Sequence, residues 1–291
     1  MGKNALIVTG RNSSKKNGSL DDVINALKSK NIKYTVYDGV EENPSVETVM
    51  EAREIGVKAG CDFIIGIGGG SPMDAAKAIG VMIYYKNENK DFLYKSVSNS
   101  QSLPVIEVPT TCGTGSEVTT VAVLTVHNEK TKKSMSHRIF PRMALVDEKY
   151  IKNAPLKVIC DTAIDALAHI VESCINNNAT EYSKMFAKEG LEAWSKFKDV
   201  LLGNREATDE DFHNMMYAST LAGMCIAHAG TSLPHGLSYP ITYELGIPHG
   251  KAVGYFLPGY INEATDEDKE FVLKAAGFET VEEFSKFYKK A

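Results

Sequence analysis

The chain has 291 residues, which suggests two domains at about 150 residues each. It is 43% hydrophobic and 24% charged, which excludes a disordered tail, a collagen-like rod and a disulfide miniprotein. The formal net charge is −5 with no evident basic face, which excludes a nucleic-acid binder because phosphates need cations. The apolar stretches are far shorter than the roughly 20 residues of a membrane span. Five scattered cysteines without a CxxC pair indicate reduced thiols, so we expect a cytoplasmic protein with no nucleic-acid or membrane partner.

The first half of the chain alternates strand and helix patterns. Apolar runs predict strands at residues 5–8, 34–37, 63–67 and 105–108, and amphipathic patterns predict helices at 20–27, 46–59 and 72–82. Residues 86–103 are polar and read as a surface loop. Short strands between helices indicate a parallel sheet that is covered on both faces.

The second half is helical. Helical patterns cover residues 161–175, 179–197, 209–228 and 250–262, and no convincing strand follows residue 155. The sequence therefore predicts an α/β domain over residues 1–150 and an all-α domain over residues 151–291.

A glycine loop follows the predicted strand at 63–67. Three consecutive glycines, Gly68 to Gly70, precede Ser71 and Pro72. Proline suits the first helical position, and the free amides of a helix start form a phosphate site. The spacing matches neither GxxxxGK[ST] nor GxGxxG, and a glycine cluster can also serve only the geometry of a turn.

A second polar loop follows the strand at 105–108. The segment PTTCGTGSE, residues 109–117, offers four hydroxyl groups and two glycines in nine residues. Parallel strands bring their carboxyl ends to one edge of a sheet. Two such loops therefore favour a nucleotide site over two unrelated turns.

The helical half contains a metal-ligand pattern. Asp165 and His169 stand at i and i+4, on one face of a helix. His235 and His249 each stand between a proline and a glycine, and we expect Pro240, Gly246 and Pro248 to break any helix between them. One aspartate and three histidines suit a divalent ion such as Fe²⁺ or Zn²⁺.

Two nearby residues leave alternatives open. His228 lies seven residues before His235 and competes with it as a ligand. Glu172, three residues after His169, is either a partner of a ligating histidine or a solvated charge.

These motifs occur together and in order: GGGSPMDAAKA, PTTCGTGSEVT, DALAH and the two HG pairs. With them the chain resembles the iron-containing (group III) alcohol dehydrogenases, within them the butanol-dehydrogenase-like members, over nearly its whole length. The resemblance implies a Rossmann-like nucleotide-binding domain, a helical metal-binding domain and an active site in the cleft between them. It implies a homo-oligomer, a dimer, that acts on a small alcohol or aldehyde.

The resemblance also implies the site residues. The metal ligands would be Asp165, His169, His235 and His249. Residues 68–71 would hold the pyrophosphate of the cofactor. The full set expected to bind NADP, or else NAD, is Gly10, Ser13, Ser14, Lys15, Gly68, Gly69, Gly70, Ser71, Asp74, Thr110, Thr111, Thr114 and Ser116. No side chain beyond the metal site is expected to be catalytic.

The chain departs from the family pattern at several places. Tyr239 stands where many members carry a further histidine. This departure leaves the metal ligands intact, but the chain lacks the histidine that would relay a proton at that position. Cys112 stands where alanine is common. A thiol beside phosphate-binding amides would favour its thiolate, and the alternative is an inert buried thiol. Both ends look shorter than usual, since an initial strand with a Phe-Gly pair and later helices are missing.

The expected function is reversible oxidation of a small primary alcohol, with a metal as Lewis acid and a nicotinamide as hydride acceptor. Two alternatives remain: a lyase related to dehydroquinate synthase, and a truncated homologue that binds nucleotide without turnover. Gly10 follows the first strand where NAD-preferring relatives often carry aspartate, and the loop that follows is rich in hydroxyl and cationic donors. We therefore expect NADPH to be preferred over NADH, although Asp38 at the end of the second strand could still bind a ribose.

Overall fold

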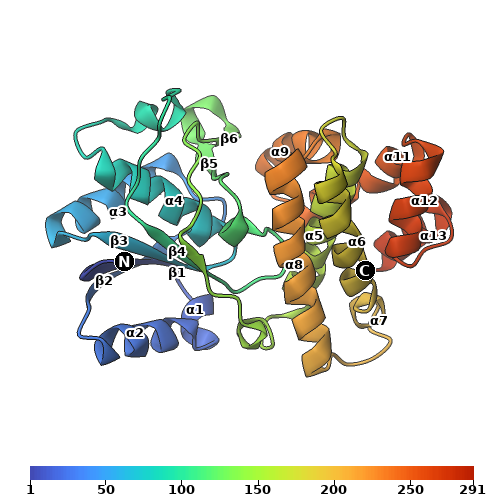
Figure 1. The fold of residues 1–291 in the computed structure, drawn as a ribbon, viewed down its shortest axis with the longest axis horizontal. Coiled ribbons are helices and arrows are strands. Elements are labelled where there is room, and N and C mark those ends of the chain that lie inside the picture. The colour runs from blue at the N-terminus through green and yellow to red at the C-terminus, as the bar shows by residue number, and fades with distance from the viewer. The chain divides into compact units, whose positions relative to one another are not determined.

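The computed structural model describes residues 1–291 as two compact units (Figure 1). The first unit comprises Met1–Thr110 and Ser116–Tyr150, and the second comprises Thr111–Gly115 and Ile151–Ala291. The segment Thr111–Gly115 thus belongs to the second unit, although the chain on either side of it belongs to the first. The sequence patterns give a single boundary near residue 150 and do not assign residues 111–115 to the second unit.

The first unit is built on a five-stranded sheet with the order β2-β1-β3-β4-β7. Every neighbouring pair in it is parallel. Its strands are β1 (Asn4–Gly10), β2 (Lys33–Val40), β3 (Phe63–Gly68), β4 (Val105–Pro109) and β7 (Met143–Ala144). Residues 5–8 of β1 and 63–67 of β3 are apolar on both faces of the sheet because helices cover both faces, which confirms the predicted fold class.

Helices lie on the two faces of this sheet (Figure 1). They are α1 (Ser13–Lys16), α2 (Ser19–Ser29), α3 (Val46–Ala59) and α4 (Gly70–Tyr84). Side chains of α2 pack with one face of the sheet, and those of α3 and α4 pack with the other. Each predicted helix and strand of this half is present with ends that move by a few residues.

Two features of the first unit escape the sequence patterns. Residues 86–103 contain a 3₁₀ helix, Lys90–Tyr94, in which Leu93 is fully buried. An antiparallel hairpin forms from β5 (Val123–Val126) and β6 (Thr131–Ser134). Its four-residue strands are too short to give a clear alternating pattern. Three more short 3₁₀ turns are Ser116–Val118, His127–Glu129 and Glu148–Tyr150.

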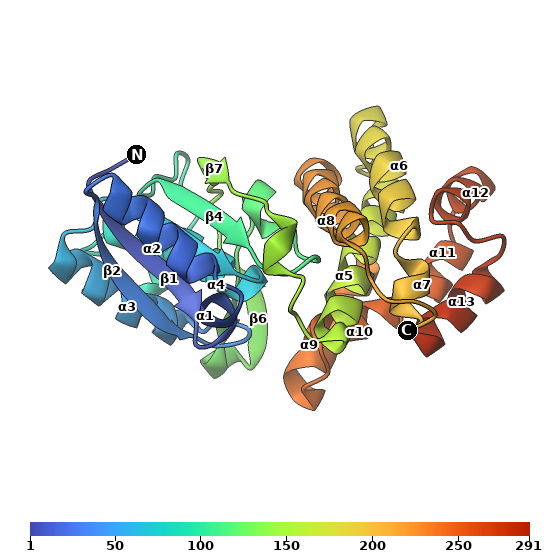
Figure 2. The same cartoon turned by 90° about the horizontal axis from the view of Figure 1, so that it is seen from below.

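The second unit is all helical, as predicted (Figure 2). Its helices are α5 (Leu156–Ile175), α6 (Glu181–Ser195), α7 (Lys198–Leu201), α8 (Asp209–Ala229), α9 (Leu233–Leu245), α10 (His249–Gly254), α11 (Leu257–Asn262), α12 (Asp266–Ala275) and α13 (Val281–Lys290). The central helix α5 contacts α6, α8 and α10. None of the helices combines the length and the apolar character that crossing a bilayer would demand.

Two expectations about the helical unit are wrong. Pro240 does not break the chain between the two histidines but lies inside α9. A proline removes one i→i−4 hydrogen bond, and buried contacts of Ser238 and Thr242 hold the helix on either side of it. The helix ends instead at Gly246, whose φ of 65° is left-handed, so the two histidines still stand on different helices. The predicted helix 250–262 is also split, because Pro258 cannot continue α10 into α11.

Candidate metal centre and glycine loop

The four predicted metal ligands meet in the second unit. Asp165 and His169 lie one turn apart on α5, His235 lies in the first turn of α9, and His249 begins α10. The Nε2 atoms of His169, His235 and His249 lie 3.9, 3.5 and 3.7 Å from Asp165 Oδ1. One carboxylate oxygen is therefore surrounded by three imidazole nitrogens.

These separations suit a metal ion. Tetrahedral ligands at about 2.1 Å from zinc would lie about 3.4 Å from each other. Asp165 Oδ1 and His235 Nε2 are buried and have no hydrogen-bond partner, which is costly unless something else binds them. Ligand atoms of Asp165, His169 and His235 all lie within 4.8 Å of one another. His249 stands outside this tight group, and its side chain is 26% exposed.

Each histidine is oriented through its other ring nitrogen. A hydrogen bond at Nδ1 leaves the Nε2 lone pair free for a metal. The acceptors at Nδ1 are Gly113 O for His169 (3.1 Å), a carboxylate oxygen of Glu172 for His235, and Ser238 Oγ for His249 (3.5 Å). The Nε2 atoms of all three rings thus lie on the side of Asp165.

Glu172 is the most connected of these supports. It is fully buried on α5, and it accepts hydrogen bonds from Ser232 N at 2.5 Å and Ser232 Oγ at 3.1 Å. Ser232 Oγ also lies 2.7 Å from the hydroxyl of Tyr260. The structure therefore places Glu172 beside a candidate ligand, and it is not a solvated charge.

The ionisation of the site is governed by the two buried carboxylates. Burial opposes the charged form of His235, but the nearby Asp165 and Glu172 raise its pKa to about 9. Burial also works against the Asp165 carboxylate, yet the charges of the surrounding histidines hold its pKa well below the ordinary value. For His169, burial dominates and lowers the pKa. In the metal-free protein, a proton on His235 thus takes the place of the metal's charge.

The glycines that follow His235 and His249 have different surroundings. A Cβ on Gly250 would lie 1.8 Å from Asp161 O and 3.2 Å from Asp165 Cβ. A Cβ on Gly236 would meet nothing within 4 Å. The absence of a side chain at Gly250 therefore allows α10 to approach α5 closely enough to bring His249 to the site.

The competing histidine lies elsewhere. His228 on α8 packs its ring against Tyr182 and Phe186, with centroids 6.4 and 5.5 Å away. Tyr239 stacks on His249 at 5.8 Å. Tyr239 thus supports the ring of a candidate ligand.

The glycine loop of the first unit joins β3 to α4. Gly68 has a φ of 152°, and a Cβ there would lie 2.6 Å from Pro72 Cγ. No side chain caps α4 and no acid occupies its first turn, so the helix start keeps free amides for an anion. Thr110 N donates to Gly68 O at 2.8 Å, and the buried Thr110 hydroxyl has no partner. Gly69, Gly70 and Ser71 are all partly exposed.

The second polar loop is divided between the units. Thr110 and Ser116 belong to the first unit, and Thr111 and Thr114 belong to the second. Ser116 is only 4% exposed, and its Oγ donates to Asp74 Oδ1 at 2.6 Å. Asp74 Oδ2 accepts from Val123 N at 2.8 Å. Asp74 and Ser116 are therefore bonded to each other within the unit.

The loop after β1 has one buried and three surface members. Ser14 is fully buried and receives a hydrogen bond from Thr9 Oγ1 at 2.7 Å, whereas Gly10, Ser13 and Lys15 lie at the surface. Lys15 Nζ lies 2.5 Å from Asp38 Oδ2. This hydrogen bond lowers the pKa of Asp38, and the cation offsets its charge.

Of the two alternatives for Cys112, the structure supports the inert buried thiol. The residue is 1% exposed, and burial raises the pKa of its thiol to about 11. Its Sγ lies 3.4 Å from Thr162 Oγ1, inside the second unit. The thiolate is therefore disfavoured at neutral pH.

A cation near the glycine loop was not predicted. Lys132 Nζ on β6 donates to Asn43 Oδ1 at 3.0 Å, and Asn43 N donates to Ser71 Oγ at 3.0 Å. Lys132 also lowers the pKa of Asp74 by its charge, against the larger effect of burial. No sequence spacing links β6 to residues 68–71, so only the structure identifies it.

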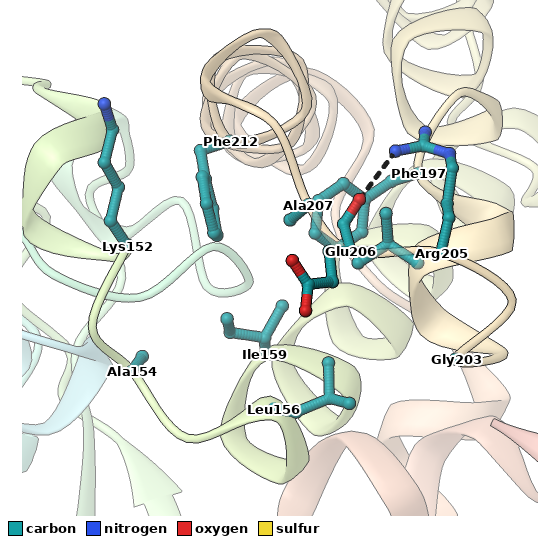
Figure 3. Close-up of a pocket in the computed structure, with 11 residues that line it drawn as sticks. Lys152, Ala154, Leu156, Ile159, Phe197, Gly203, Arg205, Glu206, Ala207 and Phe212 are labelled. Atoms are coloured by element: carbon teal, nitrogen blue, oxygen red, sulfur yellow. Dashed lines mark hydrogen bonds between the residues drawn. The ribbon is translucent and has the colours of Figure 1, made fainter.

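The second unit also contains a cavity of about 450 Å³ (Figure 3). Its lining does not include the candidate metal ligands; it consists of Lys152, Ala154, Leu156, Ile159, Phe197, Val200, Gly203, Arg205, Glu206, Ala207 and Phe212. Both of its cations are already paired, Lys152 with Asp209 at 2.7 Å and Arg205 with Asp211 at 2.5 Å. The cavity is therefore separate from the metal centre.

Comparison with known proteins assigns both halves of the chain to one family. Residues 1–148 match the family described as iron-containing alcohol dehydrogenase, and residues 159–281 match the C-terminal domain of the same family. An iron-containing alcohol dehydrogenase of Thermotoga maritima is 40% identical, with a TM-score of 0.92 over 99% of this chain and 80% of that one.

Two curated relatives match at lower identity. The long-chain primary alcohol dehydrogenase of Thermoanaerobacter ethanolicus is 33% identical over 261 residues, which are 89% of this chain and 65% of the relative. The NADPH-dependent butanol dehydrogenase of Clostridium saccharobutylicum is 32% identical over 283 residues, which are 94% of this chain and 71% of the relative. The chain thus spans about two thirds of the length of these relatives.

Alanine substitution of the glycine after His249 and of the glycine after His235 should affect metal binding differently. We expect Gly250→Ala to weaken metal binding by about tenfold or more, the size of effect seen when a ligand loses its support, because α10 must move away from Asp161. Gly236→Ala is the matched control and should bind normally. Calorimetric titration with Zn²⁺ measures both affinities. Equal affinities would show that the approach of α10 to α5 does not matter.

Alanine at His235 or His249 should abolish stoichiometric metal binding, because no other imidazole is close enough to replace the lost ligand. His228→Ala should keep the metal, since that ring packs on α6. Metal content after anaerobic purification gives the comparison. An empty site in His228→Ala together with a filled site in His235→Ala would reverse the assignment.

The metal-free protein should lose stability as the pH rises from 6.5 to 9. A raised pKa in the folded state stabilises fully below the unfolded value of 6.5, and this contribution disappears as the pH passes about 9. The loss should be on the order of 3 kcal/mol. Urea denaturation with a chelator present would measure it. The metal-loaded protein, in which His235 is already deprotonated, should lack this dependence, and a flat chelated profile would contradict the assignment.

Proposed function

The chain belongs to the iron-containing alcohol dehydrogenase family, and we propose that it interconverts a small primary alcohol and its aldehyde with NADP(H). The observation that carries this proposal is the convergence of three oriented imidazole nitrogens on one orphaned, buried carboxylate oxygen of Asp165. The names of the relatives, a long-chain primary alcohol dehydrogenase and an NADPH-dependent butanol dehydrogenase, support the same reaction class.

The metal centre would hold a divalent ion, Fe²⁺ or Zn²⁺, through Asp165, His169, His235 and His249. When bound, the metal would polarise the alcohol oxygen and the nicotinamide would exchange the hydride. The rest of the chain positions these ligands. Glu172 is central to this, because it orients His235 and is itself held by Ser232.

The first unit would bind the nucleotide. The uncapped start of α4 and the glycines before it suit the pyrophosphate, and the orphaned Thr110 hydroxyl suits a cofactor oxygen. The proposed contact set remains the one predicted from the sequence, with Lys132 added beside Ser71. Within that set, Asp74, Ser14 and Ser116 already have internal partners, so their role includes shaping the loops.

NADP(H) is the proposed form of the cofactor. Asp38, the carboxylate that could hold a ribose hydroxyl, is paired with Lys15 and lies in the field of Arg11. A 2′-phosphate would therefore meet cations and not an unpaired carboxylate. A homodimer is the proposed assembly, on the family resemblance, and light scattering would measure it.

The reaction is tested by absorbance at 340 nm. The protein is reconstituted anaerobically with Fe²⁺ or with Zn²⁺ and mixed with NADPH and butanal. Oxidation of NADPH that requires the metal and is lost in His235→Ala supports the proposal. Nucleotide binding without turnover would leave a nucleotide-binding homologue, and product without redox change would favour a lyase.

Gly10→Asp should reverse or erase the preference for NADPH. A Cβ at Gly10 has no neighbour closer than 3.5 Å, so the variant should fold, and the new carboxylate would repel a 2′-phosphate. Loss of about two hydrogen bonds to a charged phosphate, each weakened by solvent screening, predicts a change of about tenfold to a thousandfold in the ratio of kcat/KM values. Gly10→Asn, uncharged and similar in size, is the control. A higher kcat/KM with NADH in the wild type would overturn the preference.

A further inference from the structure

A lysine is completely buried in the first unit. Lys77 lies on α4 with no exposed surface, and nothing in the proposed metal or nucleotide chemistry uses it. Its ammonium reaches four oxygens of a single segment: Ser116 O at 2.6 Å, Ser116 Oγ at 2.7 Å, Val121 O at 2.9 Å and Thr119 Oγ1 at 3.3 Å.

Two carboxylates lie near this ammonium without receiving its hydrogen bonds. Asp74 Oδ1 and Glu107 Oε2 are each 4.0 Å from Lys77 Nζ. Glu107 is fully buried on β4, and neither of its carboxylate oxygens has a hydrogen-bond partner. Burial raises the pKa of Glu107 well above its usual range and raises that of Asp74 as well. Burial thus favours the neutral form of both carboxyl groups, and the close partners of the Lys77 ammonium are the four oxygens of the segment.

The direction of the donors distinguishes this arrangement from an ordinary ion pair. An ammonium has three N–H groups, and here its close contacts go to the segment from Ser116 to Val121 while the carboxylates stay beyond hydrogen-bond distance. A buried ion pair that served stability alone could be replaced by apolar side chains with little loss. The specific gain from a lysine here is that it fixes the course of this segment.

The fixed segment begins at Ser116, which belongs to the proposed nucleotide contact set. The Ser116 hydroxyl receives a hydrogen bond from Lys77 and donates its own to Asp74 Oδ1 at 2.6 Å. Asp74 lies on the helix that begins at the glycine loop. Lys77 thus links the second polar loop to the element that carries the first.

We propose that Lys77 is a positioning residue for the nicotinamide nucleotide, which holds the segment from Ser116 to Val121 against α4 in its binding conformation. This rests on the proposed function, since it assumes that the two loops bind that nucleotide. Its consequence is selective: removing the ammonium should weaken nucleotide binding and leave the metal centre of the second unit unchanged.

The test compares Lys77→Met with Met82→Ala, which opens a cavity in the buried face of the same helix. NADPH affinity is measured by fluorescence and Zn²⁺ affinity by calorimetry, on the full chain. Lys77→Met should raise the Kd for NADPH by about tenfold or more, the scale of one lost hydrogen bond to a charged group. Its Zn²⁺ affinity should match the wild type, and Met82→Ala should keep both affinities. Equal NADPH binding by Lys77→Met and the wild type would overturn the proposal.

A double variant separates positioning from charge balance. Lys77→Met combined with Glu107→Leu removes the ammonium together with the buried carboxyl group beside it and should recover thermal stability, so it also serves if Lys77→Met alone does not fold. We expect NADPH binding to remain weak in the double variant, because the four oxygens of the segment still lack their donor. Recovery of wild-type affinity would assign Lys77 to structure alone. Failure of the wild type to bind NADPH would instead refute the proposed function, and this inference with it.

Discussion

A buried carboxylate is the constraint on which the second unit depends. Asp165 is 3% exposed and sits in the middle of the central helix α5, where an uncompensated negative charge would be very costly. Three imidazoles, from α5, α9 and α10, supply the compensation. In the absence of a metal, a proton on His235 fulfils this role, and the supports at Nδ1 keep the three rings directed at the carboxylate. The helices that pack the second unit are thus also held in place by one buried charge.

The first unit also buries a charged group, but this one is a cation. Its buried charge is the ammonium of Lys77, and most of its close partners are neutral oxygens of a loop. In both units the charge is placed on a long, central helix, and its partners come from segments distant in the sequence. The metal or proton that balances Asp165 can dissociate. The ammonium of Lys77 and the oxygens that it contacts are all atoms of the chain itself and cannot. This difference fits a ligand site in one unit and a fixed scaffold in the other.

Much of this arrangement could be predicted because it is local in the sequence. The glycine loop between β3 and α4 and the i, i+4 pair of Asp165 and His169 follow from helix and strand periodicity alone. The roles of Glu172 and Lys132 could not be predicted in the same way. From the sequence, Glu172 could equally be a partner of a ligating histidine or a solvated charge. The residue that decides between these, His235, is 63 residues away. Lys132 lies on a short hairpin that gives no periodic signal.

The order of elements, the two kinds of domain and the i, i+4 pair of Asp165 and His169 follow from the sequence alone, because residue spacing and helix geometry fix which side chains share a face. The contacts and burial of each side chain are known only from the tertiary structure. It separated Gly250, pressed against Asp161, from the identical-looking Gly236, which faces open space. It buried Cys112, which raises the pKa of a thiol that the sequence placed beside phosphates. Such differences depend on contacts between distant segments, and no local pattern contains them.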